Sequence, residues 1–247
     1  MTFDMKAETT TITGHGGDEI EAYLAQPLGG GPCGGVVVIH HMPGYDRSSK
    51  EIARRFAAEG YVALMPHLHY REGAGASPDD AAAASRAAGG VPDERLVGDV
   101  DGAIRRIKSL PSSNGKVATI GYCSGGRQSF LAGISLPLDA CVDCYGAFAV
   151  GSPPEGSGLQ MTPLVDRAKD LSCPLLGLFG AEDKSPTPDQ VAQLEKALVE
   201  HGKTYEFHSY PGAGHAFFNV DRASYRPEAA IDGWGKINDF FGRYLAS

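Results

Sequence analysis

The stretch Gly121-Tyr122-Cys123-Ser124-Gly125-Gly126 decides how the rest of this chain is interpreted. It follows an apolar run at 117–120, and the residues from Ser124 onward suit a helix. A reactive residue between small neighbours at a strand-to-helix turn is typical of a nucleophile elbow, in which the backbone folds tightly around that residue. The start of the helix favours a thiolate there, through its macrodipole and free N–H groups. We therefore predict Cys123 as the nucleophile, the plain alternative being a buried structural cysteine.

Apolar runs alternate with helical patterns on both sides of this turn. Strands are expected at 33–40, 61–65, 116–121, 140–145, 174–180 and 204–210. Helices are expected at 48–60, around 97–107, from 124 onward, at 187–202 and at 227–245, with Ser48/Glu51 and Thr187/Gln190 as capping pairs. This alternation predicts an α/β fold, a mainly parallel sheet with helices on both faces. Residues 1–247 form one domain, in which 71–92 and 147–165 are candidate pocket-covering loops.

The composition narrows the class of protein. The chain of 247 residues is 42% hydrophobic and carries a net charge of −8, with both signs interspersed. It shows no basic cluster for nucleic acid and no polybasic patch for a membrane. The first residues lack the apolar segment of a signal peptide, and no apolar run is long enough for a transmembrane helix. A cytoplasmic protein is therefore predicted. Five cysteines in apolar segments fit a reducing compartment.

Two further motifs follow strands and complete a catalytic set. Phe179-Gly180-Ala181-Glu182-Asp183 ends in carboxylates, and Tyr210-Pro211-Gly212-Ala213-Gly214-His215 ends in a histidine. The chain order nucleophile, acid, histidine is that of α/β-hydrolases, and the carboxyl ends of parallel strands meet at one edge of the sheet. We predict that His215 is the base and that Asp183 orients it. Glu182 is the alternative acid, and Asp183 could instead be a turn residue.

The segment His40-His41-Met42-Pro43-Gly44-Tyr45 follows the first apolar strand. Hydrolases of this kind take one oxyanion-hole N–H from this loop and another from the residue after the nucleophile, which indicates Met42 and Ser124. A metal site is not expected, because adjacent strand residues face opposite ways and no further ligand follows. Cys141 and Cys144 face opposite sides of a strand and are expected in the core. Tyr145 either lines the pocket or is structural.

On these motifs the chain resembles the dienelactone hydrolase (carboxymethylenebutenolidase) family over almost its whole length. The resemblance implies a triad of Cys123, Asp183 and His215, an acyl-thioester intermediate, no cofactor, and a monomer or weakly associating enzyme. Two positions depart from the family pattern. His41 stands where the family has a glutamate that contacts the resting thiol, and Asn219 stands where it has an arginine that binds the substrate carboxylate.

The predicted activity is therefore hydrolysis of an ester or lactone, a small-molecule substrate. The alternatives are an acyl transferase or lyase on the same scaffold, or a ligand-binding protein with a degenerate site. Because Asn219 offers a neutral amide in place of a charged fork, neutral substrates are expected to be preferred. Arg71, together with Arg86 and Arg95, is the candidate for a replacement cation.

Overall fold

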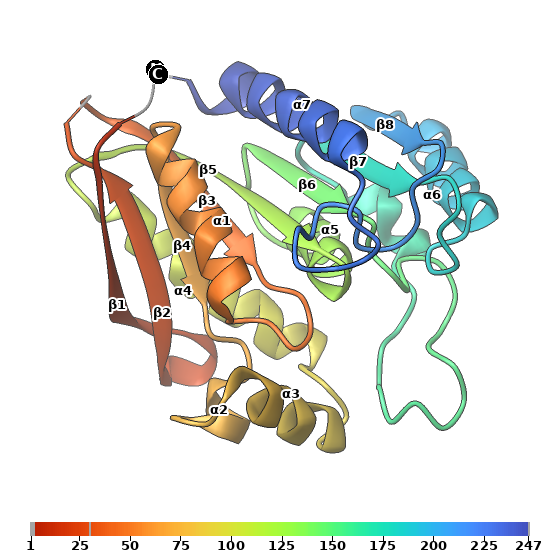
Figure 1. Cartoon of the computed structure of the whole chain (residues 1–247), viewed down its shortest axis with the longest axis horizontal. Helices are drawn as coiled ribbons and strands as arrows, with labels where there is room; N and C mark the ends of the chain where they lie inside the picture. The colour runs from red at the N-terminus through yellow and green to blue at the C-terminus, as the bar shows by residue number, and fades with distance from the viewer. Residues whose placement is uncertain (1–2, 30, 247) are drawn as a thin grey trace.

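A single eight-stranded sheet organises the computed structural model, which describes residues 3–29 and 31–246 (Figure 1). Its strand order is β1-β2-β4-β3-β5-β6-β7-β8, and the strands from β4 to β8 run parallel. The strands are β1 (Met5–Thr13), β2 (Glu19–Pro27), β3 (Cys33–Ile39), β4 (Val62–Pro66), β5 (Ser113–Tyr122), β6 (Ala140–Cys144), β7 (Leu175–Gly180) and β8 (Tyr205–Tyr210). The mainly parallel α/β sheet predicted from the sequence is confirmed.

Helices cover both faces of this sheet. The α-helices are α1 (Arg47–Ala58), α2 (Tyr70–Gly73), α3 (Pro78–Ala87), α4 (Asp93–Lys108), α5 (Ser124–Gly133), α6 (Pro188–Glu200) and α7 (Pro227–Leu245). Short 3-10 turns lie at His15–Gly17 and Val165–Asp170. One core cluster joins α1 and α7 to the sheet, and the other joins α4, α5 and α6 to its opposite face (Figure 1). Cys141 belongs to one cluster and Cys144 to the other, as the strand period predicts.

The helix ends follow capping chemistry, with one departure from the sequence prediction. Helix α6 begins with the expected capping box of Thr187 and Gln190. Helix α1 begins one residue early, because the carboxylate of Asp46 accepts a 2.7 Å bond from the Ser49 N–H. The predicted Ser48/Glu51 capping box was wrong. Asp46 is the N-cap residue instead, because aspartate caps a helix as well as serine does.

The prediction from the sequence did not include the first two strands of the sheet, and it treated residues 71–92 as a loop. Strands β1 and β2 form an antiparallel hairpin that pairs with β4, and neither strand was predicted from the sequence. Residues 71–92 contain α3 and most of α2 rather than an open loop. Neither 71–92 nor 147–165 contributes a residue to the lining of the cavity beside Cys123, although Arg86 contacts the lining residue Met42.

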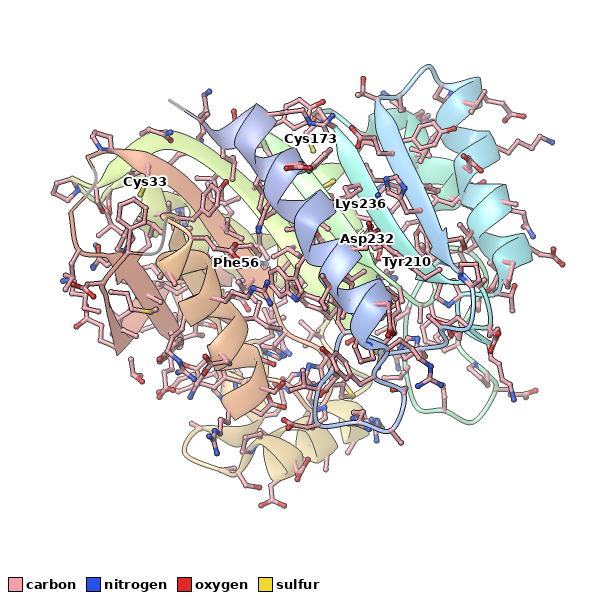
Figure 2. The ribbon with its side chains drawn as sticks, turned by 45° about the horizontal axis from the view of Figure 1, so that its top comes forward. Cys33, Phe56, Cys173, Tyr210, Asp232 and Lys236 are labelled. Atoms are coloured by element: carbon pink, nitrogen blue, oxygen red, sulfur yellow. The ribbon has the colours of Figure 1, made fainter. Side chains whose placement is uncertain are left out.

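Helices α1 and α7 lie on the same face and frame the site. Phe56 of α1 packs against α7, its ring centroid 5.5 Å from that of Trp234 and 5.7 Å from that of Phe241 (Figure 2). At the end of β8 the Tyr210 hydroxyl donates a 2.8 Å hydrogen bond to Asp232 of α7 (Figure 2). This packing holds the segment between β8 and α7 over the carboxyl edge of the sheet.

Candidate active site

The turn after β5 has the strained geometry of a nucleophile elbow. Cys123 has φ 57° and ψ −123°, a left-handed conformation that non-glycine residues rarely adopt. Its N–H donates to the Cys144 carbonyl oxygen at 3.0 Å, which ties the turn to β6. A Cβ at Gly121 would lie 1.8 Å from the Gly125 carbonyl oxygen, and one at Gly125 would lie 2.3 Å from that of Ile39. Only glycine therefore fits at these two positions.

The loops that carry Asp183 and His215 are joined by backbone hydrogen bonds. The N–H groups of Ala181 and Glu182 donate to the carbonyl oxygens of Tyr210 and Ala213, at 3.0 and 2.9 Å. Asp183 Oδ2 accepts a 2.9 Å hydrogen bond from His215 Nδ1. These contacts bring together two side chains that lie thirty-two residues apart in the sequence.

Burial separates the two carboxylates of this loop. The Asp183 side chain is 1% exposed, and its second oxygen accepts a 2.9 Å bond from the Ser185 N–H. Glu182, the alternative acid, is exposed, and among the described residues the His215 ring hydrogen-bonds to Asp183. In this geometry Asp183 rather than Glu182 orients the imidazole.

The surroundings of His215 raise its pKa. Burial lowers its pKa, but hydrogen bonds to Asp183 and to Cys123, with the charges of both, raise it to about 10. A histidine between a buried carboxylate and a thiol can stabilise a thiolate and can later return the proton. The arrangement can therefore support nucleophilic and general acid–base chemistry at one point.

A cavity of about 750 Å3 opens beside this group, between α1 and α7. Of the predicted residues, Cys123, His215, Met42, His41, Tyr145 and Asn219 line it. The ring of Tyr145 lies 5.1 Å from that of His215, centroid to centroid. Like Cys123, Tyr145 and Ala216 have positive φ angles, 45° and 62°. Backbone strain thus concentrates around the cavity, as it commonly does at functional sites.

The β3–α1 connection forms one wall of the cavity. His41 lies beside Asp46, with its Nε2 atom 3.3 Å from a carboxylate oxygen. Although burial raises the pKa of Asp46, hydrogen bonds from His41 and Ser49 hold it well below its ordinary value. In the part of the chain that the structure describes, the N–H groups of Met42 and Ser124 donate to no protein acceptor. Two backbone donors are therefore free near Cys123.

Arg71 is not brought to the cavity. Its guanidinium pairs with the buried Asp99 at 2.8 Å and with Asp18 at 2.8 Å, which ties α2 to α4 and to the turn between β1 and β2. Of the other two candidates, Arg95 pairs with Glu72, and Arg86 donates to Met42 Sδ at 3.0 Å. None of the three supplies a cation to the cavity lining.

Four arginines that were not predicted as site residues line the cavity. We call them the arginine wall: Arg47, Arg54, Arg55 and Arg222. Arg54 pairs with Glu51, and Arg55 pairs with Glu59 and lies 3.7 Å from the Trp234 ring centroid. Arg47 and Arg222 form no ion pair with any residue that the structure describes. The only signal in the sequence was the spacing of Arg47 and Arg54 along one helix, which is equally typical of a solvated face.

The parallel sheet, the strained turn and the His215–Asp183 pair at its carboxyl edge define an enzyme of the α/β-hydrolase class. The model of the dienelactone hydrolase family matches residues 20–245. This chain therefore belongs to that family, whose members hydrolyse esters and lactones.

Individual relatives agree with the family match. A provisionally assigned carboxymethylenebutenolidase of Methylorubrum extorquens is 35% identical over 228 residues, covering 91% of this chain and 77% of that protein. One of Synechocystis is 32% identical and covers 98% of both chains. A crystal structure of a provisionally assigned dienelactone hydrolase from Klebsiella pneumoniae superposes with a TM-score of 0.85, at 32% identity, over 98% of this chain and 100% of that one.

The structure also bears on membrane insertion and metal binding. Among the described residues no helix is both long enough and apolar enough to span a bilayer. Within the same residues, no group of three or more histidine, cysteine or acidic side chains is arranged to hold a metal ion.

Proposed function

We propose that this protein hydrolyses carboxylic esters or lactones through an acyl-thioester on Cys123. The observation that carries the proposal is the position of His215, which bonds Asp183 Oδ2 at 2.9 Å and lines, together with Cys123, one cavity at the carboxyl edge of the sheet. A nucleophile and a base that face the same cavity, with an acid that orients the base, are what acyl transfer to a side chain requires.

The first half of the reaction forms the thioester. The Cys123 thiolate attacks the ester carbonyl carbon, and the carbonyl oxygen gains the negative charge of a tetrahedral intermediate. The free N–H groups of Met42 and Ser124 are the donors that we assign to this oxyanion. The intermediate collapses as the bond to the leaving oxygen breaks, and the His215 imidazolium gives that oxygen its proton.

The second half regenerates the enzyme. Neutral His215 takes a proton from a water molecule as that water attacks the thioester carbonyl, and Asp183 stabilises the resulting imidazolium. Collapse of the second intermediate releases the carboxylic acid and returns the Cys123 thiolate beside His215. Atoms and charge balance with water as the sole co-reactant.

Turnover of a small activated ester tests the proposal. We expect hydrolysis by the wild type, none by Cys123→Ala, and an acyl adduct on the peptide that contains Cys123 after rapid acid quenching. Transfer of the acyl group solely to an added alcohol or amine would favour the acyl transferase. Absence of turnover together with a ligand-induced rise in Tm would favour a binding protein.

Alkylation of the five cysteines gives a second test. Cys33 and Cys173 lie at the amino ends of β3 and β7, remote from Cys123 at the carboxyl end of β5 (Figure 2). Cys141 and Cys144 are completely buried. Iodoacetamide at neutral pH should therefore label Cys123 first and abolish turnover. Labelling of Cys141 or Cys173 ahead of Cys123, with activity retained, would contradict the assignment of the nucleophile.

We also propose that the enzyme acts in the cytoplasm on a small-molecule substrate. All five cysteines are free, which fits a reducing compartment. The cavity volume of about 750 Å3 falls in the range of pockets for small organic ligands.

A further inference from the structure

Three histidines outside the triad lie together behind the β3–α1 connection. His40, His67 and His69 are 2%, 6% and 3% exposed. The His40 ring centroid lies 4.9 Å from that of His69 and 6.4 Å from that of His67, and both pairs are edge-on. They come from two different strand ends, since His40 follows β3 and the other two follow β4. We name this group the histidine clasp.

Hydrogen bonds fix the ring of His40 in one orientation. Its Nε2 accepts a 3.2 Å bond from the Leu68 N–H, and its Nδ1 lies 2.9 Å from the His41 carbonyl oxygen, to which it donates. Both bonds together require a neutral imidazole with its hydrogen on Nδ1. Burial, with smaller effects from His69 and His67, lowers the pKa of His40 well below its ordinary value. The ring is thus neutral, as the two bonds demand.

The connection is wrapped tightly around this ring. Gly44 has φ 63°, and a Cβ there would lie 1.9 Å from His40 Nδ1. The next residue, Tyr45, stacks on His67 with 4.1 Å between ring centroids and 17° between planes. His40 and Tyr45 therefore attach the segment 40–45 to the segment 67–69 near both of its ends, and Gly44 closes the turn against the His40 ring.

Met42 lies in the middle of the fastened segment and is one of the residues that line the cavity with Cys123. Its N–H follows directly after the His41 carbonyl, the group that His40 Nδ1 holds. Any rotation of that peptide would break the His40 bond and would turn the Met42 N–H away. An oxyanion donor is effective only when it is already oriented before charge develops.

We propose that His40 is a positioning residue, which through the histidine clasp holds the Met42 N–H where the oxyanion forms. This inference rests on the proposed esterase mechanism, because it assigns His40 to one step of it. His40 does not touch the substrate: it is buried behind the cavity wall and is not among the residues that line it.

Two reactions of the same thiol test the proposal. Hydrolysis of an ester passes through an oxyanion, whereas alkylation of Cys123 by iodoacetamide does not. His40→Leu should lower kcat for an activated ester by about tenfold to a hundredfold, since loss of one oxyanion donor costs about 10²–10³. KM and the alkylation rate of Cys123 should stay near their wild-type values, because only transition-state stabilisation is lost. His40→Asn is the matched control, because its side-chain amide N–H can take the place of Nδ1–H and still donate to the His41 carbonyl oxygen, and it should keep most of the activity.

Each contrary result has a distinct meaning. A folded His40→Leu with wild-type kcat overturns the proposal, and so does an equal fall in ester hydrolysis and alkylation, which would indicate general damage to the site. If His40→Leu does not fold, His40→Phe keeps an aromatic ring in the clasp while removing the Nδ1–H, and the same comparison of the two reactions applies. If the wild type hydrolyses no ester, the proposed function fails, and not the role of His40 alone.

Discussion

The two ends of the cavity differ in how their charges are held. At the reactive end, Asp183 is almost wholly buried, both of its oxygens accept hydrogen bonds, and one of these bonds holds His215 beside Cys123 in the cavity lining. At the other end, the arginine wall faces solvent: Arg47 and Arg222 are exposed, and the Arg55 side chain is 45% exposed. Both ends carry charge, but the Asp183 carboxylate is buried in protein, whereas the exposed arginines are in contact with solvent.

This contrast predicts unequal consequences of substitution. A charge interaction inside protein is weakly screened, and its partner is left without solvent when one member is removed. An exposed charge is screened within about 10 Å at 0.1 M salt, and its pairing contributes little. The reactive end should therefore govern the rate, and the arginine wall should only bias the choice of substrate.

The largest effect is expected from Asp183→Asn. An amide cannot stabilise the His215 imidazolium, and it can reverse the hydrogen bond that sets the tautomer, so kcat/KM should fall by up to about 10⁴-fold. Circular dichroism and Tm should show that the variant still folds. Glu182→Gln is the matched control, because Glu182 is exposed on the same loop, and it should remain close to wild type. Wild-type rates in Asp183→Asn with a loss in Glu182→Gln would reverse the assignment of the acid.

An intermediate effect is expected in the pH dependence of stability. The pKa of His215 is raised to about 10 in the folded protein, against an ordinary value of 6.5. A raised pKa contributes stability that is complete below about pH 6.5 and is lost as the pH rises through 10. The Tm difference between the wild type and Asp183→Asn should therefore shrink from pH 7 to pH 10. A constant difference over this range would show that the Asp183 contact does not hold the proton on His215.

The smallest effect is expected at the arginine wall. Asn219 alone predicts a preference for neutral substrates, but Arg47 and Arg222 add two exposed cations to the same cavity. Exposed ion pairs contribute about 0.2–1 kcal/mol, so a carboxylate-bearing ester should be favoured over its neutral analogue by no more than about fivefold. Arg222→Gln should remove part of this preference, and added salt should weaken it in the wild type.

The control for this small effect is Arg105→Gln, which removes an exposed arginine from α4 on the opposite face of the sheet. It should leave the ratio of kcat/KM values for the two esters unchanged. A preference of the wild type for the neutral ester, unchanged in Arg222→Gln, would contradict this prediction and support the interpretation drawn from Asn219 alone.

The sequence by itself determined the elements whose reasons are local. The elbow around Cys123 needs glycine at 121 and 125, because a Cβ there would collide with the backbone. The two glycines in the sequence were enough to predict this turn. Helix α7 has the bounds predicted from the sequence, and its first residue is a proline, which suits the start of a helix. The acid and the histidine follow strands whose carboxyl ends must share one edge, so their convergence was predictable without coordinates.

Only the tertiary structure decided which side chains of separate segments face one another. His40, His67 and His69 have no shared spacing, and they meet because β3 and β4 are parallel neighbours that end at the same level. Arg71 was predicted as a cation for the cavity, but in the structure it pairs with Asp99, a buried carboxylate on another helix. Local sequence determines the conformation of a turn or a helix end, whereas pairing between distant charges depends on how whole elements pack, and that packing is a property of the complete chain.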